Sequence, residues 1–151
     1  WDYSMGKKKT LKTYSFPKAK NIVVCGDIHG EFNAVIYRMC VQYQMTDTLL
    51  IIAGDCGFGF EKPGYYDIIF SHNSSRLSKT NNWVVMVRGN HDDPAYFNEE
   101  RISHERFRTI PDYSIIQACE FLYTMSHCST KSARSSRLIW SSPILPHHSA
   151  N

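Results

Sequence analysis

The chain has 151 residues, of which 42% are apolar and 21% charged, and its formal net charge is +3. This length and composition indicate one globular domain with its own core, and no apolar run reaches the roughly 20 residues of a membrane-spanning helix. The five cysteines, an odd number, argue against a disulfide framework and for the cytoplasm. The mild charge, without a stripe of basic and aromatic residues, argues against nucleic acid as a partner.

The first 20 residues are rich in lysine, and we interpret residues 1–20 as a basic N-terminal tail. Residues 21–151 are interpreted as one domain. The pattern described below is clear over residues 21–119, whereas residues 120–151 are rich in serine and less apolar than central strands usually are.

Three short apolar runs, residues 22–25, 49–53 and 83–87, are rich in β-branched residues and show no polar alternation. Such runs are typical of strands that are buried on both faces. The connections between the runs are long enough for a helix each time, as parallel strands require. The sequence therefore predicts a βαβαβ arrangement with a mostly parallel sheet.

The connections themselves contain helical patterns. Residues 31–44 have apolar side chains at near-helical spacing after an acidic Glu31, which indicates an amphipathic helix with Glu31 in its first turn. A second helix is predicted over residues 63–79, although the polar stretch 71–75 weakens its middle. Pro94 is expected to open a short helix. The side chains expected to form the apolar face of the first helix are Phe32, Val35, Ile36, Met39 and either Val41 or Tyr43.

Each apolar run ends in a glycine-containing loop, residues 26–30, 54–57 and 89–93. Glycine allows a sharp turn at the end of a strand, so polar side chains from all three loops are expected at one edge of the sheet.

The polar residues of these loops are suited to binding metal. Asp27 and His29 are two positions apart and can bind one ion together, while Asp55 can contact the same ion or bridge to a second. Asn90 offers a carbonyl oxygen and His91 an imidazole. This mixed set of oxygen and nitrogen ligands suits Mn²⁺, Fe or Zn²⁺ better than Ca²⁺. Two ions about 3.5–4 Å apart are a known device for displacement at phosphorus.

The order Asp-x-His, Gly-Asp and Gly-Asn-His followed by an acidic residue resembles the signature of the calcineurin-like metallophosphoesterases. The closest resemblance is to small bacterial phosphatase-like members, whose first motif often reads Gly-Asp-Ile-His-Gly. It implies an α/β fold, layered as in that family, of which this chain carries the first half and an incomplete second half. It also implies two divalent metal ions, with a hydroxide between them that attacks phosphorus.

The resemblance also implies a role for each loop residue. Asp27 and His29 would bind the first ion, Asp55 would bridge both ions, and Asn90 would bind the second. His91 would be the general acid or a contact to the transition state, so both Asn90 and His91 would lie next to the substrate.

Three further positions are less well determined. Arg88 either holds a phosphate oxygen through its planar fork or is a solvated arginine at the end of a strand. Asp92 either orients His91 or a metal ligand, or belongs with Asp93 to an ordinary helix start. The family completes its site with a Gly-His-x-His turn, which is absent here, but residues 145–150 resemble the loop before that turn and would make His148 a ligand of the second site.

Three functions are consistent with these observations. The leading hypothesis is a phosphatase-like, metal-dependent phosphoester hydrolase, represented by its N-terminal part and acting on a phosphorylated protein or small molecule. The second is a non-catalytic domain that binds metal or phosphate with an incomplete site, and the third is an α/β interaction module without metal. The sequence does not identify the substrate, because selectivity depends on loops rather than on the fold.

Overall fold

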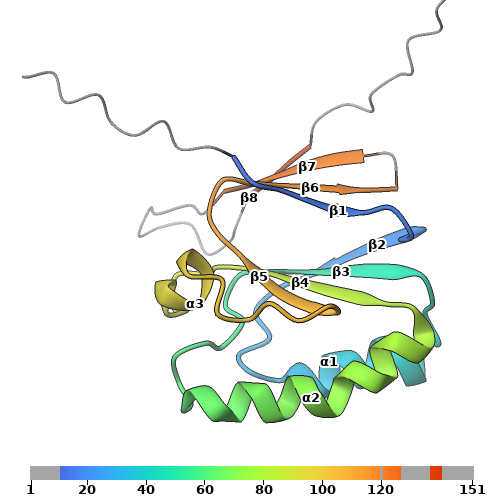
Figure 1. Ribbon diagram of the computed structural model, residues 1–151, viewed down its shortest axis with the longest axis horizontal. Coiled ribbons are helices and arrows are strands. Elements are labelled where there is room, and N and C mark those ends of the chain that lie inside the picture. Colours follow the sequence, from blue (N-terminus) through green and yellow to red (C-terminus); the bar gives the residue numbers. More distant parts are fainter. Residues whose placement is uncertain (1–10, 120, 127–136, 141–151) are drawn as a thin grey trace, which may run out of the picture.

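The computed structural model describes residues 11–119, 121–126 and 137–140, which form three layers (Figure 1). A central parallel sheet has helices on one face and a second sheet on the other. The strand order of the central sheet is β2-β3-β4-β5, with β2 (Asn21–Cys25), β3 (Thr48–Ala53), β4 (Trp83–Val87) and β5 (Phe107–Ile110). Every pair in this sheet is parallel, so the predicted α/β class and the parallel βαβαβ first half are confirmed.

The second sheet has the order β1-β6-β7-β8. Its strands are β1 (Thr13–Phe16), β6 (Ser114–Ala118), β7 (Phe121–Ser126) and β8 (Arg137–Trp140). β1 pairs with β6 in parallel, whereas β6, β7 and β8 pair in antiparallel fashion. Part of the serine-rich second half therefore forms strands.

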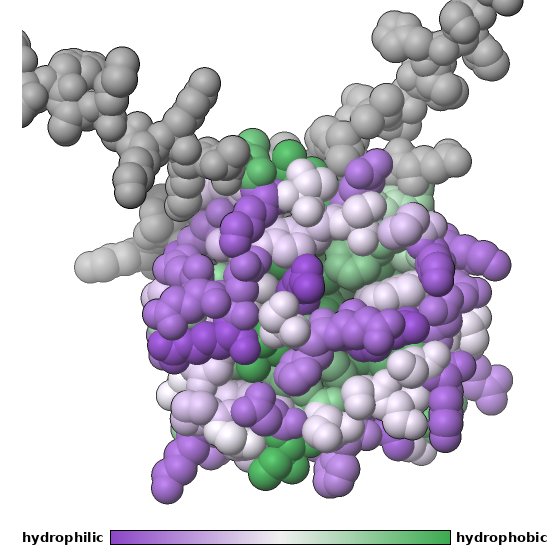
Figure 2. All heavy atoms as spheres, in the orientation of Figure 1, coloured by the Kyte–Doolittle hydropathy of each residue, from purple (hydrophilic) through white to green (hydrophobic). Residues whose placement is uncertain are grey.

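The central sheet separates two hydrophobic cores. Leu50 and Met86 face the core shared with the helices, whereas Leu49 and Val85 face the core shared with the second sheet. Because alternate side chains of β3 and β4 enter different cores, these strands have no polar face, as their sequences predict. Figure 2 shows one face of the molecule, on which hydrophilic side chains are interspersed with pale and apolar ones.

The prediction that all three strands are covered on both faces is wrong for β2. This strand lies at the edge of its sheet, and the Val24 side chain is 43% exposed. Its sequence resembles that of β3 because both are short apolar runs, and the sequence alone carries no information on which strand lies at an edge.

The first helical segment consists of α1 (Phe32–Tyr37) and a π-helical turn, η1 (Arg38–Gln42). Glu31 is the N-cap residue and does not lie in the first turn, contrary to the prediction. Val41 and Tyr43 are both exposed, so neither extends the apolar face. The wider π turn accounts for this difference, because it shifts the spacing of the side chains that follow it.

The predicted second helix is confirmed as α2 (Pro63–Thr80), and its polar stretch at residues 71–75 does not interrupt it. Asn73 lies in the middle of its polar stretch and is buried. Its amide donates to the backbone oxygen of Ile69 at 2.9 Å and to Oδ1 of Asn33 at 2.6 Å. The polar side chain therefore bonds to α2 itself and to α1, and the helix is not interrupted.

Residues 1–20 were assigned to a tail, but Thr13–Phe16 form β1. Tyr14 is 7% exposed and belongs to the core between the sheets. The lysines before this segment obscure a strand of only four residues, which is stabilised by pairing with β6 about 100 positions later in the chain. Among the described residues, no helix is long and apolar enough to cross a membrane.

Candidate metal centre

The loops that follow β2 and β3 are joined by backbone hydrogen bonds. The amide of Asp27 donates to the oxygen of Gly54 at 3.2 Å, and that of His29 donates to the oxygen of Asp55 at 3.0 Å. The amide of Gly30 likewise donates to the oxygen of Cys56 at 2.8 Å. The spacing of the first two polar loops is therefore set by the main chain.

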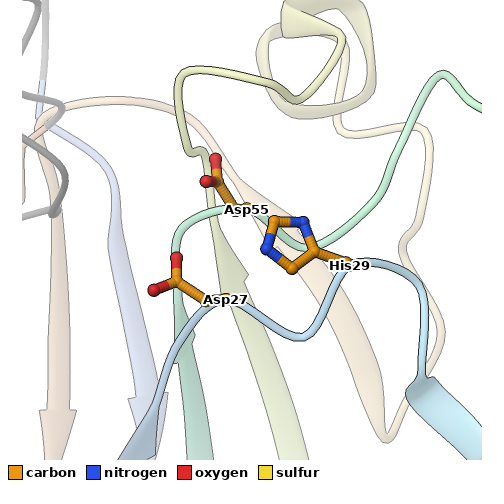
Figure 3. A group of neighbouring side chains, drawn as sticks. All are labelled: Asp27, His29 and Asp55. Carbon is orange, nitrogen blue, oxygen red and sulfur yellow. The ribbon is translucent and has the colours of Figure 1, made fainter.

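Asp27, His29 and Asp55 form a group that can hold a metal ion. Each offers one ligand atom, and these atoms all lie within 4.8 Å of one another. Figure 3 shows the three side chains on the loops at the ends of β2 and β3, around a common space. Asp27 and His29 are exposed, whereas Asp55 is only 9% exposed. Two carboxylates and one imidazole are a suitable donor set for Mn²⁺, Fe or Zn²⁺.

All three residues have a left-handed backbone conformation, with φ of 55° at Asp27, 46° at His29 and 43° at Asp55. This conformation costs a residue with a Cβ roughly 1–2 kcal/mol. Strained conformations of this kind cluster at functional sites, where the surrounding structure enforces them. Among the described residues, three of the nine non-glycine residues with a positive φ therefore lie in this group.

His91 is bound to the buried member of this group. Its Nδ1 donates to Oδ2 of Asp55 at 3.0 Å, and its backbone amide donates to Oδ1 at 3.3 Å. Burial acts to raise the pKa of Asp55, but the hydrogen bonds from His91 and the nearby His29 outweigh burial and lower this pKa. Asp55 is therefore held as a carboxylate, the form that binds metal. The His91 side chain itself is 60% exposed.

Two glycines allow the loops to approach each other. A Cβ on Gly89 would lie 2.0 Å from the backbone nitrogen of Asp55, and one on Gly57 would lie 2.3 Å from that of Gly30. Both distances are far below van der Waals contact. The packing of the three loops therefore depends on the absence of side chains at these positions.

The two aspartates after His91 have separate roles. Asp93 accepts a hydrogen bond from the amide of Ala95 and caps α3 (Pro94–Asn98), as expected of a helix start. Asp92, in contrast, is 4% exposed and accepts from backbone amides of the second and third loops. Neither interpretation of Asp92 from the sequence identified these contacts, because its bonding partners are up to 36 positions away.

The remaining candidate residues are placed as follows. Asn90 is exposed, with its amide nitrogen 3.4 Å from Nε2 of His91. Arg88 is not a solvated arginine, because its side chain is 18% exposed and lies 2.9 Å from the carboxylate of Asp112. A role of Arg88 in holding phosphate remains a prediction. His148 lies outside the described residues.

Cys56 lies inside the second loop but is completely buried, and its thiol lies 3.4 Å from the backbone oxygen of Val87. Burial, together with the nearby carboxylate of Asp92, raises the pKa of this thiol well above its usual value. The thiol is therefore neutral and serves to pack the loop.

Comparison with known proteins gave one family. A family model described as calcineurin-like phosphoesterase matches residues 20–142. No solved structure matches the chain. The matched range includes all three polar loops, two of which carry the group of Asp27, His29 and Asp55.

Proposed function

Since the chain belongs to the calcineurin-like phosphoesterase family, we propose that it is a phosphatase-like hydrolase that uses two divalent ions, Mn²⁺, Fe or Zn²⁺. The observation that carries this proposal is the convergence of Asp27, His29 and Asp55, whose ligand atoms lie within 4.8 Å of one another. The proposed substrates are phosphorylated proteins or phosphorylated small molecules.

The residues of the chain would have distinct tasks. Asp27, His29 and Asp55 would hold metal, and Asn90 would add an oxygen ligand for a second ion. When bound, such ions neutralise charge on the phosphoryl oxygens and lower the pKa of water to about 7. The hydrogen bond between His91 and Asp55 helps to keep Asp55 ionised and so ready to bind a cation.

We assign proton transfer to His91. Hydrolysis cleaves the bond between phosphorus and the leaving oxygen, which needs a proton, and an imidazole can supply one near neutral pH. Nδ1 of His91 is engaged with Asp55 at 3.0 Å, so Nε2 would act on the substrate. The 60% exposure of the side chain supports this role, because a substrate can reach the ring.

The proposed location is the cytoplasm. The four cysteines within the described residues, Cys25, Cys40, Cys56 and Cys119, are all free. Free cysteines are typical of reducing compartments.

The test compares Asp55→Asn with Asp67→Asn. Asp67 lies on α2 with 68% of its side chain exposed, so the second variant makes the same chemical change away from the loops. Metal content is measured after dialysis against Mn²⁺ or Zn²⁺, and hydrolysis is measured with a generic aryl phosphate. Asp55→Asn should lose at least about 100-fold in activity, since partners outside the ligand shell alone are worth 10–100-fold.

Asp67→Asn should retain both metal and activity. Hydrolysis that survives Asp55→Asn would overturn the proposed mechanism. Absence of bound metal in the unmodified chain would overturn any metal-dependent function.

A second function, metal binding without catalysis, is supported by one observation. Within the part of the chain that the structure describes, a single group of three ligands is found, and one such group suits one ion. Stoichiometric metal without turnover of aryl phosphate, phosphopeptide or nucleotide substrates would favour this alternative.

A further inference from the structure

The carboxylate of Asp92 joins two of the three loops at the metal centre. Its Oδ1 accepts from the amides of Gly57 at 2.7 Å and Phe58 at 3.0 Å. Its Oδ2 accepts from the amides of Cys56 at 3.0 Å and Gly89 at 2.8 Å. Each carboxylate oxygen therefore holds two backbone donors, and the side chain is almost completely buried.

Three of these donors belong to consecutive residues, Cys56, Gly57 and Phe58. Successive amides that point to one side form a concave site for an anion. Here the anion is a side chain of the protein itself. Hydrogen bonds to a charged acceptor are roughly twice as strong as neutral ones, so Asp92 is a strong link between the segment after Asp55 and the segment that begins at Gly89.

This link through Asp92 lies next to the proposed metal ligand Asp55. The three consecutive donors follow Asp55 directly, and Asp55 has a left-handed conformation that must be enforced by its surroundings. The fourth donor is Gly89, which begins the loop that carries Asn90 and His91. Asp92 thus fixes the main chain on both sides of the contact between Asp55 and His91.

We propose that Asp92 is a positioning residue of the metal centre. Its carboxylate acts as an internal anion that holds Asp55 and the loop of His91 at the spacing that metal binding requires. This inference rests on the proposed function only for the presence of a metal, not for hydrolysis.

The chain supplies a matched control in Asp93. Both aspartates lie in the same loop and accept backbone hydrogen bonds, but Asp93 bonds to α3 and Asp92 bonds to the metal loops. Asp92→Ala leaves four amides around an empty space, whereas Asp93→Ala removes only a helix cap. Asp92→Asn keeps the shape of the side chain, but the NH2 group of its amide would face two backbone N–H donors in either orientation.

The experiment measures Mn²⁺ and Zn²⁺ affinity by titration calorimetry on the full chain, with circular dichroism as the check of folding. Asp92→Ala and Asp92→Asn should bind metal about 10–100-fold more weakly, and Asp93→Ala should bind as the unmodified chain does. Added formate should restore affinity to Asp92→Ala by occupying the four amides. Formamide, which is neutral, should not restore it, and formate should not strengthen binding to Asp93→Ala.

Unchanged affinity in folded Asp92 variants, or restoration by formamide as well as formate, would overturn the inference. Failure of both variants to fold even with formate would also overturn it, because Asp92 would then serve the fold as a whole. If the unmodified chain binds no metal, the proposed function itself fails, and this result is distinct from a chain that binds metal equally well with and without Asp92.

Discussion

Replacement of Gly89 by alanine should disrupt the metal centre through a single methyl group. The added Cβ would lie 2.0 Å from the backbone nitrogen and 2.3 Å from Oδ1 of Asp55. Real Cβ atoms essentially never approach other heavy atoms more closely than 3.0 Å. Asp55 or the start of the third loop must therefore move by about 1 Å, because the nearest atom is a main-chain nitrogen that cannot rotate away as a side chain could.

Two consequences of this shift can be estimated. Extra atoms in a well-packed region cost about 1–3 kcal/mol, which corresponds to a fall in melting temperature of about 2–12 °C for a chain of this size. A functional site tolerates displacements of only about 0.5 Å. Metal affinity should therefore fall by at least about tenfold, the lower limit for disturbed partners of metal ligands.

The assay combines urea unfolding of the metal-free chain with calorimetric titration of Mn²⁺. Gly64→Ala is the first control, because Gly64 lies in the first turn of α2 with nothing within 4 Å of its added Cβ. This change should leave stability the same or raise it by about 0.4–1 kcal/mol. Gly30→Ala is the second control, since Gly30 has open space but a φ of 86°. It should show conformational strain of roughly 1–2 kcal/mol without a clash.

The expected order of stability is therefore Gly64→Ala, then Gly30→Ala, with Gly89→Ala among the least stable and weakest in metal binding. The close approach of the second and third loops would be refuted if Gly89→Ala had the same free energy of unfolding and the same Mn²⁺ affinity as the unmodified chain.

Three further predictions concern parts of the fold that support the site. Tyr66→Phe should cost about 1–3 kcal/mol in urea unfolding, because the buried hydroxyl bonds three backbone groups of the loop after β3; a loss below 0.5 kcal/mol would contradict this. Asp93→Ala should cost about 0.5–2 kcal/mol by removing the cap of α3, and unchanged unfolding would argue against the cap. Burial acts to raise the pKa of Glu100, but hydrogen bonds from Lys12 and Tyr14 outweigh it and hold this pKa below 4.5. The stabilisation by Glu100 is therefore complete above pH 4.5 and is lost as the pH falls. The Glu100→Gln variant should have a lower free energy of unfolding near neutral pH, and this free energy should fall less on acidification than that of the unmodified chain. Parallel curves of unfolding free energy against pH for the two proteins would contradict this.

The features that the sequence could predict are those encoded within a few residues. The apolar runs that form β2, β3 and β4, the long connections between them and the polar residues at their ends are all local patterns. They were sufficient to bring Asp27, His29 and Asp55 to one edge of a sheet, because parallel strands with crossover connections end on the same side.

The features that were missed depend on distant parts of the chain. β1 is a strand because it pairs with β6. Val24 is exposed on a strand at the edge of its sheet, and the place of a strand in its sheet depends on distant segments. The contacts of Asp92 involve amides up to 36 positions away. The short motif Asp-Asp-Pro looks the same in the sequence whether its aspartates cap a helix or bridge two loops. Only the folded structure distinguishes these two roles.

The left-handed conformations of Asp27, His29 and Asp55 lower the stability of the metal-free chain. Glycine adopts such conformations without a steric penalty, so a search for stabilising substitutions would select glycine at the proposed ligand positions and thereby remove the proposed site. Such conflict between stability and activity is common in natural proteins. Directed evolution of this chain should therefore apply selection for metal binding whenever it applies selection for thermal resistance.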